Sequence, residues 1–313
     1  MQPSIAPRAT SDGHGQRRRP VWWRDERLQY VLMFLPALLL LIGVLYPFGL
    51  GVFKSFTNER LYLPSVDFVG LRNYVDLFSD PVFRGSLGRT IGFVVAVLAV
   101  QLPLGVGIAL LLDATSPFRT FFRNTLVLPL LIPPIVAGLM WKTMMQPASG
   151  VLNWFLRSLG LEALPWLTHP STALASVVLI ETWVFIPFVT LILLAGLQAI
   201  PNDVLEAVRV DGANEVQAFW YVKLPWLWPY ALLVMLFRIP DALKAFDIIY
   251  PATRGGPLDA TRLMHVMAYQ EAFRWSNIGT AMAILFVLWL IAYVVSMNVM
   301  RSWRERSGAV QGG

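Results

Sequence analysis

PNDVLEAVRVDGANEVQAFWYVKLP, residues 201–225, is a long polar interruption in a sequence that is otherwise mostly apolar. It lies between the fourth and the fifth of six apolar segments that are long enough to cross a membrane. The interruption is too polar for burial in lipid, and its helical pattern is too regular for a simple connecting loop. We therefore expect it to have a role of its own outside the hydrocarbon.

Two short helices are predicted within residues 201–225. Apolar residues between Val204 and Val208 form a stripe at helical spacing. Gly212 fits the left-handed position that commonly ends a helix. Asn214, with Gln217 three residues later, predicts a capping box at the start of the second helix.

The predicted hairpin turns at Asp211–Gly212, and Pro225 marks the expected return into the membrane. A helical hairpin with exposed acidic and apolar side chains is suited to fill a groove on another protein.

Composition identifies an integral membrane protein. Of the 313 residues, 56% are hydrophobic and 14% are charged, whereas soluble domains carry about 25% charged residues. Cysteine is absent, which excludes disulfides and thiolate metal sites. The formal charge of +6 comes largely from basic residues beside apolar segments. This pattern is typical of loops that face anionic lipid, and it disfavours nucleic acid as a partner.

The six apolar segments predict an all-α fold, because only helices satisfy their backbone groups across a bilayer at this length. Several spans contain proline, including Pro129, Pro133 and Pro134 in the third and Pro240 in the fifth, which favours a bundle that lines a cavity. The expected spans are about 30–53, 88–112, 122–145, 172–197, 226–250 and 279–300.

Basic residues near the span ends predict that both termini and the polar insert are cytoplasmic. Residues 1–20 are expected to be a disordered cytoplasmic tail, 21–303 a transmembrane domain, and 304–313 a second cytoplasmic tail. We expect no cleaved signal peptide, because the first apolar run is too long.

Two loops on the opposite side, 62–86 and 147–170, carry apolar residues at near-helical spacing. They predict either interfacial helices that seal the bundle or a docking surface for an external partner, and the two are compatible.

The polar insert resembles the EAA loop of bacterial ABC importer permeases. The resemblance rests on Glu206-Ala207, Asp211-Gly212-Ala213, Phe219 and Leu224-Pro225, while Val208 departs from the motif. Residues 68–90 and 246–257 resemble segments of the carbohydrate-type (maltose, trehalose or glycerol phosphate) permeases.

The resemblance implies a type I importer permease fold over residues 21–303, with 201–225 as coupling helices that seat in a cleft of an ATP-binding subunit. The coupling residues that it implies are Glu206, Ala207, Arg209, Asp211, Gly212 and Phe219.

Four charged residues, Arg238, Asp241, Lys244 and Asp247, lie in the fifth apolar segment. Each costs at least about 2.5–3.5 kcal/mol at mid-membrane unless it is paired. Their spacing of three permits pairs along one helix, and Glu181 in the fourth segment is a further partner for either cation. These charges indicate either a structural salt-bridge network or a polar solute pathway.

By resemblance, the fourth and fifth spans supply sugar contacts near mid-membrane. Ala242 and Ala245 stand where relatives often carry amides or hydroxyls, so an anionic solute is also considered for Arg238 and Lys244. The predicted pathway residues are Glu181, Trp183, Phe185, Phe188, Arg238, Asp241, Ala242, Lys244 and Ala245.

The sequence contains no G-x-x-x-x-G-K-[ST] loop, so ATP and Mg²⁺ are expected on partner subunits and no cofactor is expected on this chain. The resemblance implies four kinds of partner: a second homologous permease, two ATP-binding subunits, an extracytoplasmic solute-binding protein and membrane lipid. It also implies a multi-pass location in the bacterial inner membrane and half of a pathway for a sugar or sugar-derived solute.

Two other functions were weighed. A stand-alone secondary transporter would use Asp241 or Glu181 as a proton site. For an intramembrane enzyme, Glu181 and His169 are the only candidate catalytic residues. We expect that the chain is not an enzyme and that it holds no metal.

Overall fold

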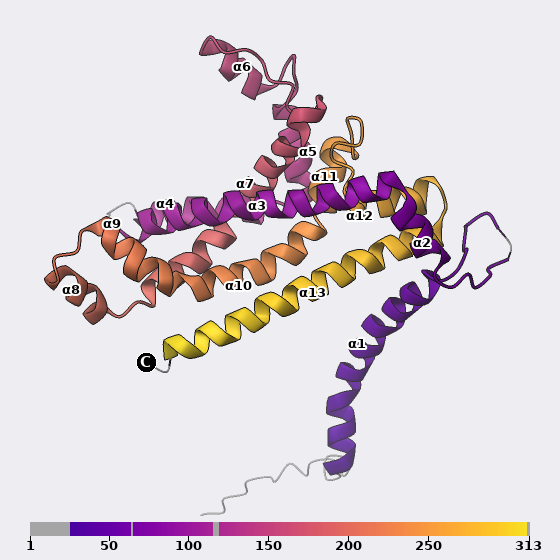
Figure 1. The fold of residues 1–313 in the computed structure, drawn as a ribbon, viewed down its shortest axis with the longest axis horizontal. Coiled ribbons are helices and arrows are strands. Elements are labelled where there is room, and N and C mark those ends of the chain that lie inside the picture. Colours follow the sequence, from indigo (N-terminus) through magenta and orange to yellow (C-terminus); the bar gives the residue numbers. More distant parts are fainter. Residues whose placement is uncertain (1–25, 64, 115–118, 312–313) are drawn as a thin grey trace, which may run out of the picture. The chain divides into compact units, whose positions relative to one another are not determined.

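The computed structural model describes residues 26–63, 65–114 and 119–311, which are almost entirely helical (Figure 1). The chain divides into two units, residues 1–50 and 51–313. The described part of the first unit belongs to one long apolar helix, α1 (Glu26–Lys54), which ends in the second unit. The expected tail at 1–20 lies outside the described residues.

Four further long helices form the frame of the second unit: α3 (Pro81–Asp113), α7 (Pro170–Gln198), α10 (Leu224–Leu243) and α13 (Ile278–Gln311). α10 packs against α3, α7 and α13 (Figure 1). In the described residues, five helices are long and apolar enough to cross a membrane, or six if one bent pair counts as a span. The all-α membrane fold predicted from sequence is confirmed.

α3 and α7 approach each other closely at Gly105. A Cβ atom added at this glycine would lie 2.6 Å from Val189 Cγ1, which is too close for two carbon atoms. The absence of a side chain at Gly105 thus sets the spacing of the two helices that carry Gln101 and Glu181.

The third expected span, 122–145, is not one helix. It consists of α4 (Arg119–Val127), the short η2 turn (Leu128–Leu131) and α5 (Pro134–Met144), with a bend of 97°. Pro129, Pro133 and Pro134 lie in or beside the bend. Their missing donors prevent the regular hydrogen bonding that would continue the helix, which explains the break.

The fifth expected span, 226–250, also differs from the prediction at both ends. α10 stops at Leu243, and after a short break at Lys244 the chain continues as α11 (Phe246–Thr253). At the other end no turn occurs at Pro225. α9 (Glu215–Ala218), the π-helical η3 (Phe219–Lys223) and α10 form one continuous helical run, so the second helix of the insert continues directly into the span.

α13 extends to Gln311, so residues 304–311 of the expected C-terminal tail are helical. Four short elements lie in the segments that were predicted to face outward: α2 (Arg72–Ser79), α6 (Val151–Ser158), α12 (Met264–Tyr269) and η4 (Gln270–Arg274). The predicted cytoplasmic insert begins with α8 (Asn202–Val210).

Candidate functional site

The polar insert forms the predicted hairpin of helices. α8 ends at Val210 with Asp211 as its C-cap, and Gly212 has a φ of 78°, the left-handed conformation expected for it. Asn214 Oδ1 accepts from the Gln217 backbone N–H at 2.8 Å, and Gln217 Oε1 accepts from the Asn214 N–H at 2.9 Å. The capping box predicted from sequence is therefore confirmed.

The predicted coupling residues lie mostly on the exposed surface of this hairpin. Five of them are exposed and Phe219 is partly buried, while no residue of α8 is buried. A groove of about 750 Å³ lies between the hairpin and the end of α3 and is lined by Arg209, Phe219, Trp220 and Asp113 among others. The hairpin thus presents charged and aromatic side chains that its own chain does not cover.

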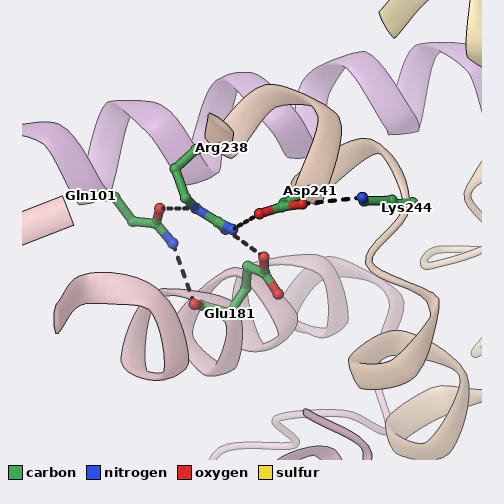
Figure 2. A network of polar contacts seen from close by, with 5 residues as sticks. All are labelled: Gln101, Glu181, Arg238, Asp241 and Lys244. Atoms are coloured by element: carbon green, nitrogen blue, oxygen red, sulfur yellow. Dashed lines mark hydrogen bonds and ion pairs between the residues drawn. The ribbon is translucent and has the colours of Figure 1, made fainter. Parts of the chain in front are cut away.

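A second polar cluster lies within the bundle, where α3, α7 and α10 meet (Figure 2). Arg238 Nη2 donates to Glu181 Oε1 at 2.6 Å, and Arg238 Nε donates to Gln101 Oε1 at 3.1 Å. Gln101 Nε2 in turn donates to the Glu181 backbone oxygen at 3.3 Å. The Phe185 ring centroid lies 4.0 Å from the guanidinium carbon. Gln101, Glu181 and Arg238 are fully buried, so the pair is enclosed by its own helices, while Glu181 Oε2 and Arg238 Nη1 have no hydrogen-bond partner in the described structure.

The cluster continues from the buried pair to the helix break. Arg238 Nη1 lies 3.7 Å from Asp241 Oδ2, and Lys244 Nζ lies 3.3 Å from Asp241 Oδ1. The side chains of Asp241 and Lys244 are 43% and 69% exposed. The cluster therefore has a buried inner half, Glu181 with Arg238, and an accessible outer half, Asp241 with Lys244.

Three of the ion pairs considered from sequence are present: Arg238 with Asp241, Lys244 with Asp241, and Arg238 with Glu181. In the described part of the chain Asp247 is exposed and joins none of these pairs. Sequence reasoning missed Gln101. Its signal was a single amide in the apolar second segment, with nothing to show which helix it would face.

The remaining pathway candidates do not gather around the accessible charges. Trp183 packs edge-to-face on Trp141 at 5.6 Å, and Phe188 packs on Phe237 at 6.0 Å. Ala242 and Ala245 are buried in the core. In this conformation, Asp241 and Lys244 are the predicted pathway residues whose polar groups are most open to a solute.

No group of three potential metal-ligating side chains occurs within residues 26–63, 65–114 and 119–311. His169 caps the start of α7, and Glu181 lies twelve residues further along the same helix, about 18 Å away at 1.5 Å per residue. The two residues considered for an enzyme are therefore not brought together.

Outside the candidate spans, His265 on α12 is 6% exposed, and its Nδ1 lies 3.0 Å from the Leu243 carbonyl oxygen. Burial lowers the pKa of His265 from 6.5 to about 4, against the smaller opposite effect of this backbone contact.

Comparison with known proteins gives a consistent result. Residues 101–306 match the family described as binding-protein-dependent transport system inner membrane component. A probable ABC transporter permease protein of Sinorhizobium fredii is 36% identical over 300 residues, which cover 94% of this chain and 94% of that protein. The trehalose/maltose transport system permease protein MalF of Thermococcus litoralis is 36% identical over 290 residues, covering 90% of this chain and 97% of its own.

A solved structure shares the fold. The chain superposes with a TM-score of 0.78 on a chain of a bacterial ABC transporter involved in the import of the acidic polysaccharide alginate. The two are 21% identical, and the match covers 90% of this chain and 98% of that one.

The chain belongs to the family of binding-protein-dependent transport system inner membrane components. This membership confirms the resemblance to ABC importer permeases that was first seen in residues 201–225.

Proposed function

We propose that the chain is a permease subunit of an ATP-driven importer and forms half of the pathway for a sugar or sugar-derived solute. The solute would be delivered by an extracytoplasmic solute-binding protein. The sugar class is supported by the trehalose/maltose relative, which shares 36% identity over nearly its whole length. The chain itself would act as a transport subunit of the bacterial inner membrane and not as an enzyme.

One observation carries the proposal: an exposed helical hairpin continues without interruption into a span. α9, η3 and α10 form one run from Glu215 to Leu243, and the accessible pair of Asp241 and Lys244 lies at the end of that run. A force applied to the hairpin would therefore reach the polar cluster through a single helical element. ATP hydrolysis, with its Mg²⁺, would take place on two partner ATP-binding subunits.

The coupling role is proposed for Glu206, Ala207, Arg209, Asp211, Gly212 and Phe219, and the nine pathway residues keep their proposed role as well. In this scheme Asp241 and Lys244 contact the solute, whose hydroxyl groups can donate to a carboxylate and accept from an ammonium. A second, homologous permease would complete the pathway.

The alternative, a secondary transporter that works alone, is less compatible with the geometry. Glu181 is fully buried and its Oε1 lies 2.6 Å from the Arg238 guanidinium. With no exposed surface and with a cation of its own chain in contact, Glu181 is poorly placed to exchange protons with water.

Reconstitution distinguishes the two functions. The complete assembly in proteoliposomes, with the binding protein and internal ATP, should accumulate solute, and omission of the ATP-binding subunits should abolish accumulation. Proton-driven uptake by this chain alone, without ATP, would overturn the proposal and favour the secondary transporter.

A further inference from the structure

α6 and the loop after it expose an unusually apolar surface, here called the α6 patch. The side chain of Trp154 is 65% exposed and that of Phe155 56%. The whole patch consists of Val151, Trp154, Phe155, Leu159, Leu161 and Leu164.

The α6 patch is held in a defined conformation by Asn153, which is fully buried beneath it. Asn153 Oδ1 accepts from the Leu164 N–H at 3.0 Å and from Trp166 Nε1 at 2.9 Å, and Asn153 Nδ2 donates to the Leu164 carbonyl at 2.9 Å. A buried amide with several partners holds the loop against α6 at Leu164 and at Trp166. The apolar exposure is therefore a property of an ordered element.

The charged side chain of α6 bonds to its own loop, and the Ser158 hydroxyl donates to the Phe155 carbonyl at 2.7 Å. Arg157 Nη2 donates to the Ala148 carbonyl at 2.9 Å, and Arg157 Nε donates to the Asn153 carbonyl at 3.1 Å. The cation thus contacts its own loop. Glu162 is an exposed charge in the adjoining loop, so the helical face itself carries no charged group.

A tight turn joins α6 to the end of α5. α5 ends at Met144 and α6 begins at Val151. A Cβ atom at Gly150 would lie 2.4 Å from the carbonyl oxygens of both Met144 and Gln146, so this close turn requires glycine. Figure 1 shows α6 beside the end of α5 and away from α13. The patch therefore begins within seven residues of an element that belongs to a candidate span.

We propose that the α6 patch lies in the outer leaflet of the membrane, with its apolar side chains at the boundary between headgroups and acyl chains. Tryptophan and phenylalanine on one face of a short helix, followed by exposed leucines in the adjoining loop, are the composition of interfacial anchors. A surface for a soluble protein normally carries a polar rim with several hydrogen-bonding groups. The helical face of the patch offers the Trp154 indole N–H and the Ser158 hydroxyl, which already donates to the Phe155 carbonyl, and Glu162 is the charged group in its loop part. Because α6 follows α5 so closely, the patch lies near the end of a candidate span, where a helix would meet the boundary between lipid and water.

The sequence has no cysteine, so one spin label can be placed at Phe155→Cys in the assembled transporter in lipid nanodiscs. Leu258→Cys is the matched control, because Leu258 is 90% exposed in the segment between the fifth and sixth expected spans. The label at residue 155 should show a several-fold higher ratio of collisions with oxygen to collisions with a nickel chelate than the label at residue 258. Leu159→Cys, which replaces another patch residue, repeats the test if the first variant assembles poorly.

Two results would overturn the proposal. Equal accessibility of both labels to the nickel chelate would place the patch in water. Protection of the residue 155 label from both reagents, either in the assembled transporter or after addition of the solute-binding protein, would show that protein covers the patch. Both readouts are independent of transport, so they separate this proposal from the proposed function.

Discussion

The hairpin at residues 201–225 and the Arg238 cluster are both polar interruptions of apolar sequence, yet they hold their charges in opposite ways. Among the described residues, no ion pair joins Glu206, Arg209 or Asp211 to another side chain, and all three are exposed. Glu181 and Arg238 are fully buried and contact each other at 2.6 Å. Charges that the chain buries are paired inside it. The hairpin pairs Glu215 with Lys223 but leaves Glu206, Arg209 and Asp211 for water or for another protein.

This difference has an energetic consequence. Removal of one partner from a buried pair leaves an uncompensated charge and costs about 3–5 kcal/mol. Exposed charges and pairs contribute about 0–1 kcal/mol. Substitutions in the cluster should therefore act on stability first, and substitutions in the hairpin on coupling first.

The largest effect is expected for Arg238→Ala, which leaves the buried Glu181 carboxylate without its cation and removes the partner of Gln101 Oε1. We expect a loss of about 3–5 kcal/mol and little folded protein after detergent extraction, measured by thermal denaturation and size-exclusion chromatography. Lys244→Ala is the control and should extract normally, because its side chain is 69% exposed. Equal stability of Arg238→Ala and the parent protein would contradict the claim that the buried Arg238–Glu181 pair is needed for stability.

The double variant Arg238→Met with Glu181→Gln distinguishes an unpaired buried charge from lost packing. It removes both charges while keeping similar volumes, so it should recover much of the stability that Arg238→Ala loses. If the double variant were less stable than Arg238→Ala, the loss would come from packing and not from an unpaired charge.

His265 gives the next largest effect, because it is buried and its Nε2 has no hydrogen-bond partner in the described structure, so protonation would place an unpaired charge there. Its pKa is about 4 in the folded chain, against 6.5 ordinarily, so only the unfolded chain binds a proton between these values. Stability should be complete above pH 6.5 and fall as the pH decreases toward 4, by about 1.4 kcal/mol at pH 5.5. Thermal denaturation across this range should show the slope in the parent protein and a flatter profile in His265→Leu.

A smaller effect is expected at the hairpin from Asn214→Ala, which removes the capping box. Loss of such a cap costs about 1 kcal/mol, so amide exchange over residues 215–223 should accelerate about fivefold, as measured by mass spectrometry. Asn202→Ala is the matched control, because no hydrogen bond of the Asn202 side chain occurs in the described structure. Unchanged exchange in Asn214→Ala would mean that other contacts hold the second helix.

The accessible half of the cluster should show the smallest effect on stability, within about 1 kcal/mol. Asp241→Asn or Lys244→Gln should instead raise the KM of uptake several-fold, because these side chains are proposed to meet the solute. A change in the thermal midpoint without a change in KM would assign the outer half to packing, like the inner half.

How much the sequence predicts depends on the range of the interactions involved. The hairpin was predictable because Gly212, Asn214 and Gln217 act within a few residues of one another. The hydrogen bonds among Gln101, Glu181 and Arg238 were only partly predictable, because they depend on how three helices rotate and pack. Charge balance identified Glu181 as an available acid, but no local signal linked Gln101 to Arg238.

Helix interruptions show the same limit. The prolines at 129, 133 and 134 predicted a kink, but the 97° bend depends on how α4 and α5 pack against other helices. The π-helical turn at Phe219–Lys223, which carries the hairpin into α10 without a break, left no recognised signal. The roles of the individual coupling and pathway residues stay predictions.

The central claim is that the exposed hairpin transmits work from an ATP-binding partner. Its most direct test is the ratio of solute transported to ATP hydrolysed in proteoliposomes for Glu206→Lys and Gly212→Leu. The controls are Glu162→Lys, the same charge reversal on an outer loop, and Gly212→Asn, since asparagine tolerates a left-handed conformation. We predict at least a tenfold drop in this ratio for the first two variants, with normal extraction and stability, and no such drop in the controls. Full coupled transport by Glu206→Lys or Gly212→Leu would contradict the claim.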